Sequence, residues 1–124
     1  MRNRQSGQAT VELALCLPFV AAIVAGVVEL GFLVGDYVTL WHGAREAARA
    51  AVVDPEPAAA RKAIERVGLE GVEVLVRPDP AYRVQGRPLS VSLSYTPSGH
   101  VPLVGELASA LEFRAHASMR IEQP

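Results

Sequence analysis

Hydrophobic and polar positions divide this chain into two parts with different periods. An uncharged apolar run extends from Leu13 to Val28, and after Glu29 the apolar character continues to Gly35. These about 23 residues would span roughly 34 Å as a helix, enough to cross a bilayer core of ~30 Å. The pattern predicts a membrane-spanning helix over residues 8–35.

A helical pattern continues beyond the apolar run, as an extension of the same helix over residues 36–54. Its apolar positions, spaced by three or four, are Val34, Tyr37, Val38, Trp41, Ala44, Ala48, Ala51 and Val52. Asp54 precedes a proline and is therefore disfavoured in helical geometry. One helix from about Ala9 to Val53, roughly 68 Å long, is predicted.

The remaining residues, 55–124, predict a small α+β domain. Pro57 is suited to the first position of a short helix, and Gly68 is suited to close it. Three later segments alternate apolar and polar residues with a period of two, which is typical of strands with one buried face. These segments are 72–77, 89–96 and 113–122. We expect about three strands to form an antiparallel sheet that covers the outer half of the long helix.

Two connections in this domain differ in character. The loop Pro78–Pro88 is rich in turn-forming residues and is predicted to be exposed. The segment 101–111 is unusually apolar for a connection and is predicted to form a helical turn or two. It either caps the core or lies on a membrane surface or a neighbouring subunit.

Composition and charge exclude several classes of function. The formal net charge is −1 and only Arg61 and Lys62 form a basic cluster in the domain, which argues against a nucleic-acid surface. His42, His100 and His116 lack the spacing of metal ligands, and neither a phosphate-binding loop nor a nucleophile elbow is present. The sequence predicts no enzyme, no cofactor and no metal.

The N-terminus combines basic residues with one acid at the start of the apolar run. Arg2 and Arg4 precede the run, so the positive-inside rule predicts a cytoplasmic N-terminus and an external domain. A carboxylate at Glu12 costs on the order of 2.5–3.5 kcal/mol at membrane depth, so such a residue usually has a partner or a function. The alternative is that Glu12 reaches water at the cytoplasmic interface.

Gly7 followed by Gln8, with Glu12 as the fifth residue after the glycine, resembles the processing site of type IV prepilins. In that family a membrane-bound prepilin peptidase cleaves after the glycine. The resemblance implies a leader over residues 1–7 and a mature N-terminus at Gln8. It also implies that Glu12 pairs with the N-terminal amine of a neighbouring subunit, because each charge offsets the cost of burying the other.

Four motifs indicate a more specific resemblance within the type IV pilins. They are Gly7–Glu12, Leu17-Pro18, Glu29–Gly31 and Ala44–Arg49, which together resemble TadE-like proteins, the minor pilins or pseudopilins of tight-adherence (Flp) pili. The implied partners are a prepilin peptidase, other pilins and minor pilins, the pilus assembly platform of the inner membrane and the lipid bilayer.

Further positions on the long helix are candidates for a kink or for subunit contacts. Pro18 lies inside the helix and is predicted to kink it. Glu29 is a candidate for subunit contact. Arg45, Glu46 and Arg49 form a charged stripe that either contacts a partner pilin or is solvated.

The predicted function is that of a TadE-like minor pilin. Such a chain is first a single-pass protein of the inner membrane and is then incorporated into an extracellular pilus. The major Flp pilin is disfavoured because the mature subunit of that family is little more than the helix. One alternative is a membrane-anchored accessory protein of a pilus or secretion apparatus that never polymerises. Another is a domain exported by an ordinary signal peptide and cut near Val27.

Overall fold

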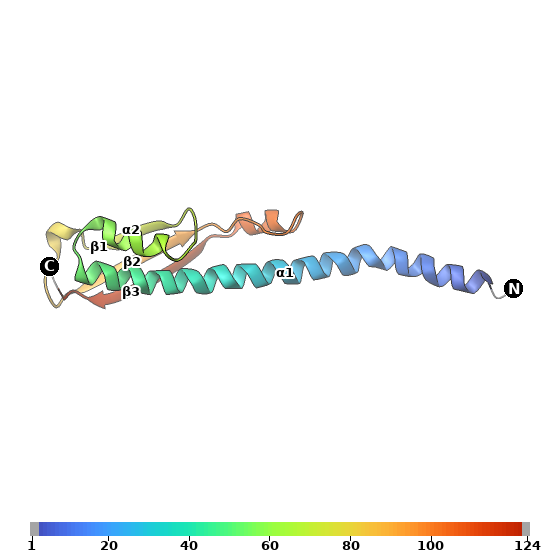
Figure 1. Cartoon of the computed structure of the whole chain (residues 1–124), viewed down its shortest axis with the longest axis horizontal. Coiled ribbons are helices and arrows are strands. Elements are labelled where there is room, and N and C mark those ends of the chain that lie inside the picture. Colours follow the sequence, from blue (N-terminus) through green and yellow to red (C-terminus); the bar gives the residue numbers. More distant parts are fainter. Residues whose placement is uncertain (1–2, 123–124) are drawn as a thin grey trace.

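A computed structural model describes residues 3–122 and the side chains from Gly7 onward. The helices are α1 (Asn3–Val53) and α2 (Pro57–Glu65), and the strands are β1 (Glu73–Arg77), β2 (Pro88–Tyr95) and β3 (Phe113–Arg120). Two short 3₁₀ helices are η1 (Pro80–Tyr82) and η2 (Gly105–Ala110). The other elements gather around the C-terminal half of α1, and its N-terminal half projects alone (Figure 1). The predicted α+β fold is confirmed.

Helix α1 begins earlier than the sequence pattern predicts. It starts at Asn3 instead of Ala9, so the backbone passes through Gly7 in helical conformation. Its 51 residues would measure roughly 76 Å at ~1.5 Å per residue. Pro18 lies inside the helix, which stays continuous and curves gently in its N-terminal part (Figure 1).

The three strands form one antiparallel sheet in the order β1-β2-β3. Val91 of β2 pairs with Val76 and Ala117, so three inward-facing residues form one row across the sheet. The alternation predicted from the sequence is confirmed on all three strands. A slip of one residue would turn each apolar row to solvent, and the register is therefore fixed by burial.

The core lies between the sheet, α2 and the C-terminal half of α1. The buried apolar residues on α1 are Leu40, Ala44, Ala47, Ala48, Ala51 and Val52. Small side chains on this face allow the other elements to approach closely. A Cβ atom on Gly43 would lie 3.2 Å from Cδ1 of Ile64, so α2 packs directly over that position.

The predicted inner face of α1 is correct from Trp41 onward, since Trp41 also packs against the core, but it is wrong at Val34 and Val38. Val34 and Val38 are 61% and 48% exposed, whereas Leu40 is buried. Asp36, which is not one of the predicted apolar positions, also faces the domain and accepts a hydrogen bond from Tyr95 Oη at 3.2 Å. Hydrophobic periodicity cannot distinguish a face covered by a domain from a face covered by another apolar medium.

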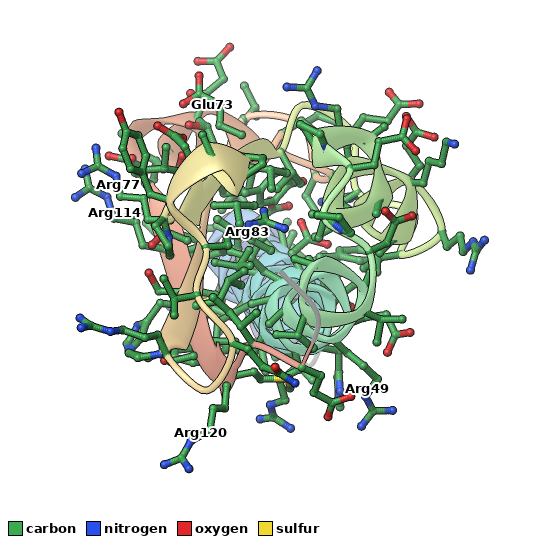
Figure 2. The ribbon with its side chains drawn as sticks, turned by 90° about the vertical axis from the view of Figure 1, so that its left-hand side faces the viewer. Arg49, Glu73, Arg77, Arg83, Arg114 and Arg120 are labelled. Atoms are coloured by element: carbon green, nitrogen blue, oxygen red, sulfur yellow. The ribbon has the colours of Figure 1, made fainter. Side chains whose placement is uncertain are left out.

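The loop between β1 and β2 contains a buried cation that the sequence did not reveal. Most of this loop is exposed as predicted, but Arg83 is only 7% exposed. Its Nη1 donates to the carbonyl oxygen of Ala51 at 3.1 Å, and its Nε donates to that of Pro78 at 3.4 Å. Figure 2 shows Arg83 turned toward the interior, whereas Arg49, Arg77 and the other labelled arginines point outward. Because Ala51 lies in the last turn of α1, Arg83 satisfies a carbonyl that has no intrahelical partner.

We expect Arg83→Met to lower the free energy of unfolding by about 1.5–3 kcal/mol, because a buried carbonyl loses a charged donor. The measurement is denaturant unfolding of the full chain in detergent micelles, followed by fluorescence of Trp41, the single tryptophan. Arg87→Met, at an exposed position, is the control and should change stability by less than about 0.5 kcal/mol. Equal effects of the two substitutions would contradict the role of Arg83.

The connection 101–111 contains the predicted helical turns, in η2, but it does not cap the core. Leu103 is 90% exposed and Leu107 is 73% exposed, whereas Gly105 and Ala108 face inward. The segment projects beyond the strands and runs beside α1 (Figure 1). Its large apolar side chains therefore contribute almost nothing to the core.

Candidate functional site

The N-terminal half of α1 is an apolar surface without cover. From Gly7 to Val28 all residues are exposed except Ala25 and Gly26, which are half-buried. Soluble monomers rarely expose a continuous apolar surface of this kind, which marks contact with a membrane or with other protein chains. Among the described residues, α1 is the one helix long and apolar enough to span a bilayer. This part of the structure is compatible with a single-pass membrane protein.

The predicted processing site lies on the exposed helix. A Cβ atom added to Gly7 would meet no atom within 4 Å, so the glycine is not required for packing inside the chain. Glycine lowers helix stability by about 1 kcal/mol relative to alanine, so the helix unwinds more easily at this position. The open surroundings and the weak helix at Gly7 are both suited to recognition by a peptidase.

The structure brings Gln8 and Glu12 together on one side of α1. Gln8 Nε2 donates a hydrogen bond to Glu12 Oε1 at 3.1 Å across one helical turn. Glu12 forms no ion pair with any residue from Gly7 to Glu122. Its carboxylate is exposed and can accept a cationic partner from another molecule or from solvent.

Glu29, unlike the exposed Glu12, is buried and bound by other residues of the same chain. It is only 3% exposed, and its carboxylate accepts hydrogen bonds from the backbone N–H groups of His100 and Val101. The shortest of these bonds is 2.8 Å, from Val101. The ring of Phe32 stacks on that of His100 with centroids 4.5 Å apart. The segment after β2 is therefore fixed to α1, and the subunit contact predicted for Glu29 stays a prediction.

We expect Glu29→Ala to loosen this attachment selectively. Hydrogen bonds to a charged acceptor contribute about 1.5–3 kcal/mol, so amide hydrogen exchange at His100 and Val101 should accelerate about tenfold or more. Glu29→Gln keeps an acceptor oxygen and should show a smaller increase. Glu106→Ala, an exposed position in the same segment, is the matched control. Unchanged exchange in Glu29→Ala would show that the carboxylate does not hold the segment.

The charged stripe of Arg45, Glu46 and Arg49 is exposed. None of the three takes part in an ion pair in the part of the chain that the structure describes. Beside Glu46 and Arg49, a shallow groove between α1 and α2 also holds Lys62 and Arg66. The stripe is available to a partner, and its predicted role in subunit contact is untested.

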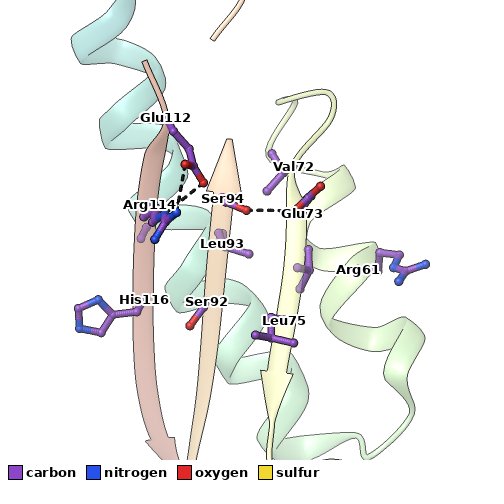
Figure 3. A pocket seen from close by; sticks show the side chains of 12 residues that line it. Arg61, Val72, Glu73, Leu75, Ser92, Leu93, Ser94, Glu112, Arg114 and His116 are labelled. Carbon is purple, nitrogen blue, oxygen red and sulfur yellow. Dashed lines mark hydrogen bonds and ion pairs between the residues drawn. The ribbon is translucent and has the colours of Figure 1, made fainter. Parts of the chain in front are cut away.

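The outer face of the sheet carries a second hollow (Figure 3). Ser94 Oγ donates to Glu73 at 3.4 Å, and the guanidinium of Arg114 donates to both oxygens of Glu112 at 3.1 Å. The hydrogen-bonded Arg114 lowers the pKa of Glu112 below its ordinary value. These polar groups are paired with one another at exposed positions, and such surface pairs contribute little to the free energy of folding.

The histidines of the described chain take part in ring contacts or are exposed. No group of three or more histidine, cysteine, aspartate or glutamate residues that could hold a metal ion occurs between residues 3 and 122. His116 packs against Trp41 with ring centroids 5.5 Å apart, and His100 belongs to the contact with Phe32.

Comparison with known proteins finds similarity to one protein family, and this similarity is confined to the long helix α1. The family model described as TadE-like protein matches residues 7–49. No curated protein and no solved structure matches the chain. The matched stretch begins at Gly7, includes the whole uncovered apolar surface and ends on the charged stripe at Arg49. The match confirms the resemblance to the TadE-like family, a structural family associated with tight-adherence pili, and it rests on α1.

Proposed function

We propose that this chain is a minor pilin, or pseudopilin, that takes part in the assembly of tight-adherence (Flp) pili. Helix α1 crosses the cytoplasmic membrane with its N-terminus inside, and residues 55–124 form a domain outside. The observation that carries the proposal is the coincidence of the family match with the uncovered apolar half of α1. The match starts at the residue at which the predicted leader ends.

Processing is the first step of the proposed function. A prepilin peptidase hydrolyses the peptide bond between Gly7 and Gln8, which leaves a carboxylate on Gly7 and an ammonium group on Gln8. Hydrolysis also removes Arg2 and Arg4, the basic residues that hold the N-terminus at the cytoplasmic face. The mature helix then has no lysine or arginine before Arg45, and its apolar half can leave the bilayer for a filament.

The new ammonium group gives Glu12 a partner. In an assembled array the amine of one subunit approaches Glu12 of the next subunit inside the apolar layer. The pair offsets part of the desolvation of both charges, and it fixes the register because an unpaired charge there costs several kcal/mol. The exposure of Glu12, and the lack of a cationic partner for it among residues 7–122, support this role.

N-terminal sequencing of the mature protein tests the proposal against its two alternatives. A start at Gln8 is expected for the processed pilin. An intact Met1 would identify a permanent membrane anchor, and a start near Val27 would identify a domain exported by an ordinary signal peptide.

Fractionation then separates a minor pilin from a processed protein that never polymerises. We expect the mature chain both in the membrane and in filaments sheared from the cell surface. Its restriction to the membrane fraction, with filaments present but free of it, would favour an accessory protein of the assembly machinery.

A further inference from the structure

The segment between β2 and β3 forms a closed loop beside α1. Its two arms touch at Gly99 and Gly105, where a Cβ atom on Gly105 would lie 2.7 Å from Cα of Gly99. The N–H of Gly105 donates to the carbonyl oxygen of Val101 at 2.7 Å across the loop. We call residues 99–111 the tip loop. The backbones at Gly99 and Gly105 lie too close together to leave room for a side chain at either position. The tip loop therefore has a defined backbone conformation.

The tip loop exposes leucine side chains that make little contact with the rest of the chain. Leu103 is 90% exposed, and its φ of 70° lies in the left-handed region that leucine rarely adopts. Leu107 is 73% exposed on the same loop. A strained backbone that exposes an apolar side chain points to a partner outside the chain.

The position of the tip loop along α1 indicates which apolar medium it meets. The about 21 residues from Gln8 to Val28 would span roughly 32 Å, close to the thickness of a bilayer core. We place the end of the span at Val28, seven residues before the end predicted from the sequence, because Glu29 is buried and bound by the segment after β2. Glu29 therefore falls at the outer boundary of this span. Because Glu29 binds the N–H groups of His100 and Val101, the tip loop is held at the same depth.

We infer that the tip loop inserts Leu103 and Leu107 into the outer interface of the same bilayer that α1 crosses. Lipid, not a charged protein surface, fits best because the tip loop is continuous with the uncovered helix and carries one acidic side chain, Glu106. This inference rests on the proposed membrane span. It adds a second membrane contact, which would set the orientation of the domain until the subunit leaves the bilayer.

The test uses the full chain in phosphatidylcholine vesicles with single fluorescent labels. Cys16 is the single cysteine, so Cys16→Ser gives a cysteine-free background. Cysteine is then introduced as Leu103→Cys, as Ile23→Cys within the span, or as Leu75→Cys on the exposed face of the sheet. Each variant carries an environment-sensitive dye, and nitroxide is placed either at the lipid headgroup or deep in the acyl chain.

We expect the label at Leu103 to lose most of its emission to headgroup nitroxide and much less to deep nitroxide. The label at Ile23 should show the opposite order, and the label at Leu75 should respond to neither. Adding Glu29→Ala should reduce the quenching at Leu103 and leave that at Ile23 unchanged. Adding Glu106→Ala should change neither.

The other outcomes distinguish a failure of the proposed membrane contact of the tip loop from a failure of the proposed membrane span. A label at Leu103 that only an aqueous quencher reaches, with Ile23 still in lipid, would overturn the membrane contact of the tip loop and leave the proposed span intact. A label at Ile23 that stays in water would overturn both. Shielding of Leu103 that rises with protein density and is insensitive to both nitroxides would assign the loop to a second copy of the chain.

Discussion

Gly7→Phe should fold and insert normally and yet never be shortened. The expected loss of cleavage is complete, because the proposed peptidase must bind the backbone around the scissile bond and a bulky side chain occupies that approach. Inside the chain the substitution meets open space, since nothing lies within 4 Å of the added Cβ. A defect in processing would therefore not come from a defect in folding.

The measurement for Gly7→Phe is the size of the protein on gels, in cells that contain the active peptidase. Gly26→Phe is the matched control, because its Cβ also meets nothing within 4 Å and it lies far from the predicted bond. We expect Gly26→Phe to be shortened as the natural sequence is. Normal shortening of Gly7→Phe would defeat the processing claim.

Glu12→Gln should insert and be cleaved normally but should fail to enter the filament. The amide keeps the shape and an oxygen acceptor for the hydrogen bond from Gln8, so the local helix is preserved. Removing one partner of a buried ion pair costs about 3–5 kcal/mol, which lowers incorporation more than about a hundredfold. Glu12→Ala should show the same loss, because the effect comes from charge and not from shape.

Incorporation is measured as the ratio of the mature chain in sheared filaments to that in membranes. Glu46→Gln is the control for removal of an acidic group at an exposed site outside the apolar surface. We expect it to be incorporated within about twofold of the natural chain, as is usual for a solvated charge. Incorporation of Glu12→Gln at the natural level would remove the pairing role.

Local patterns predict most of the secondary structure of this chain. The alternation around Val91 predicts both the strand and its buried face, because side chains on a strand alternate between two faces. Pro57 and Gly68 mark the ends of the α2 region, although the helix itself ends at Glu65 and Gly68 follows with φ of 83°. The start of α1 at Asn3 was missed because the helix continues through Gly7 instead of beginning after it.

Contacts between distant segments escape such patterns. Glu29 and His100 are 71 residues apart, and neither shows a spacing that pairs them. Arg83 lies in a turn-rich loop, where a cation usually points to water, and only the path of the loop brings it to the end of α1. In both cases a side chain satisfies backbone groups, and the tertiary path decides which groups are left without partners.

The residues of the candidate site are close together in the sequence, and the site could therefore be predicted from a sequence motif. Gly7, Gln8 and Glu12 lie within two turns of one helix, and the family match begins at Gly7. What a single chain does not contain is the second subunit, so the pairing of Glu12 with an amine stays a prediction. Its test depends on whether the amine of Gln8 ever exists.

Intact-mass measurement of the native protein tests that point most directly. We expect the chain from cells with an active prepilin peptidase to lack the mass of residues 1–7 and to begin at Gln8. The chain from cells with an inactive peptidase should keep the full mass. A chain that is never cleaved after Gly7, even beside the active enzyme, would contradict the account.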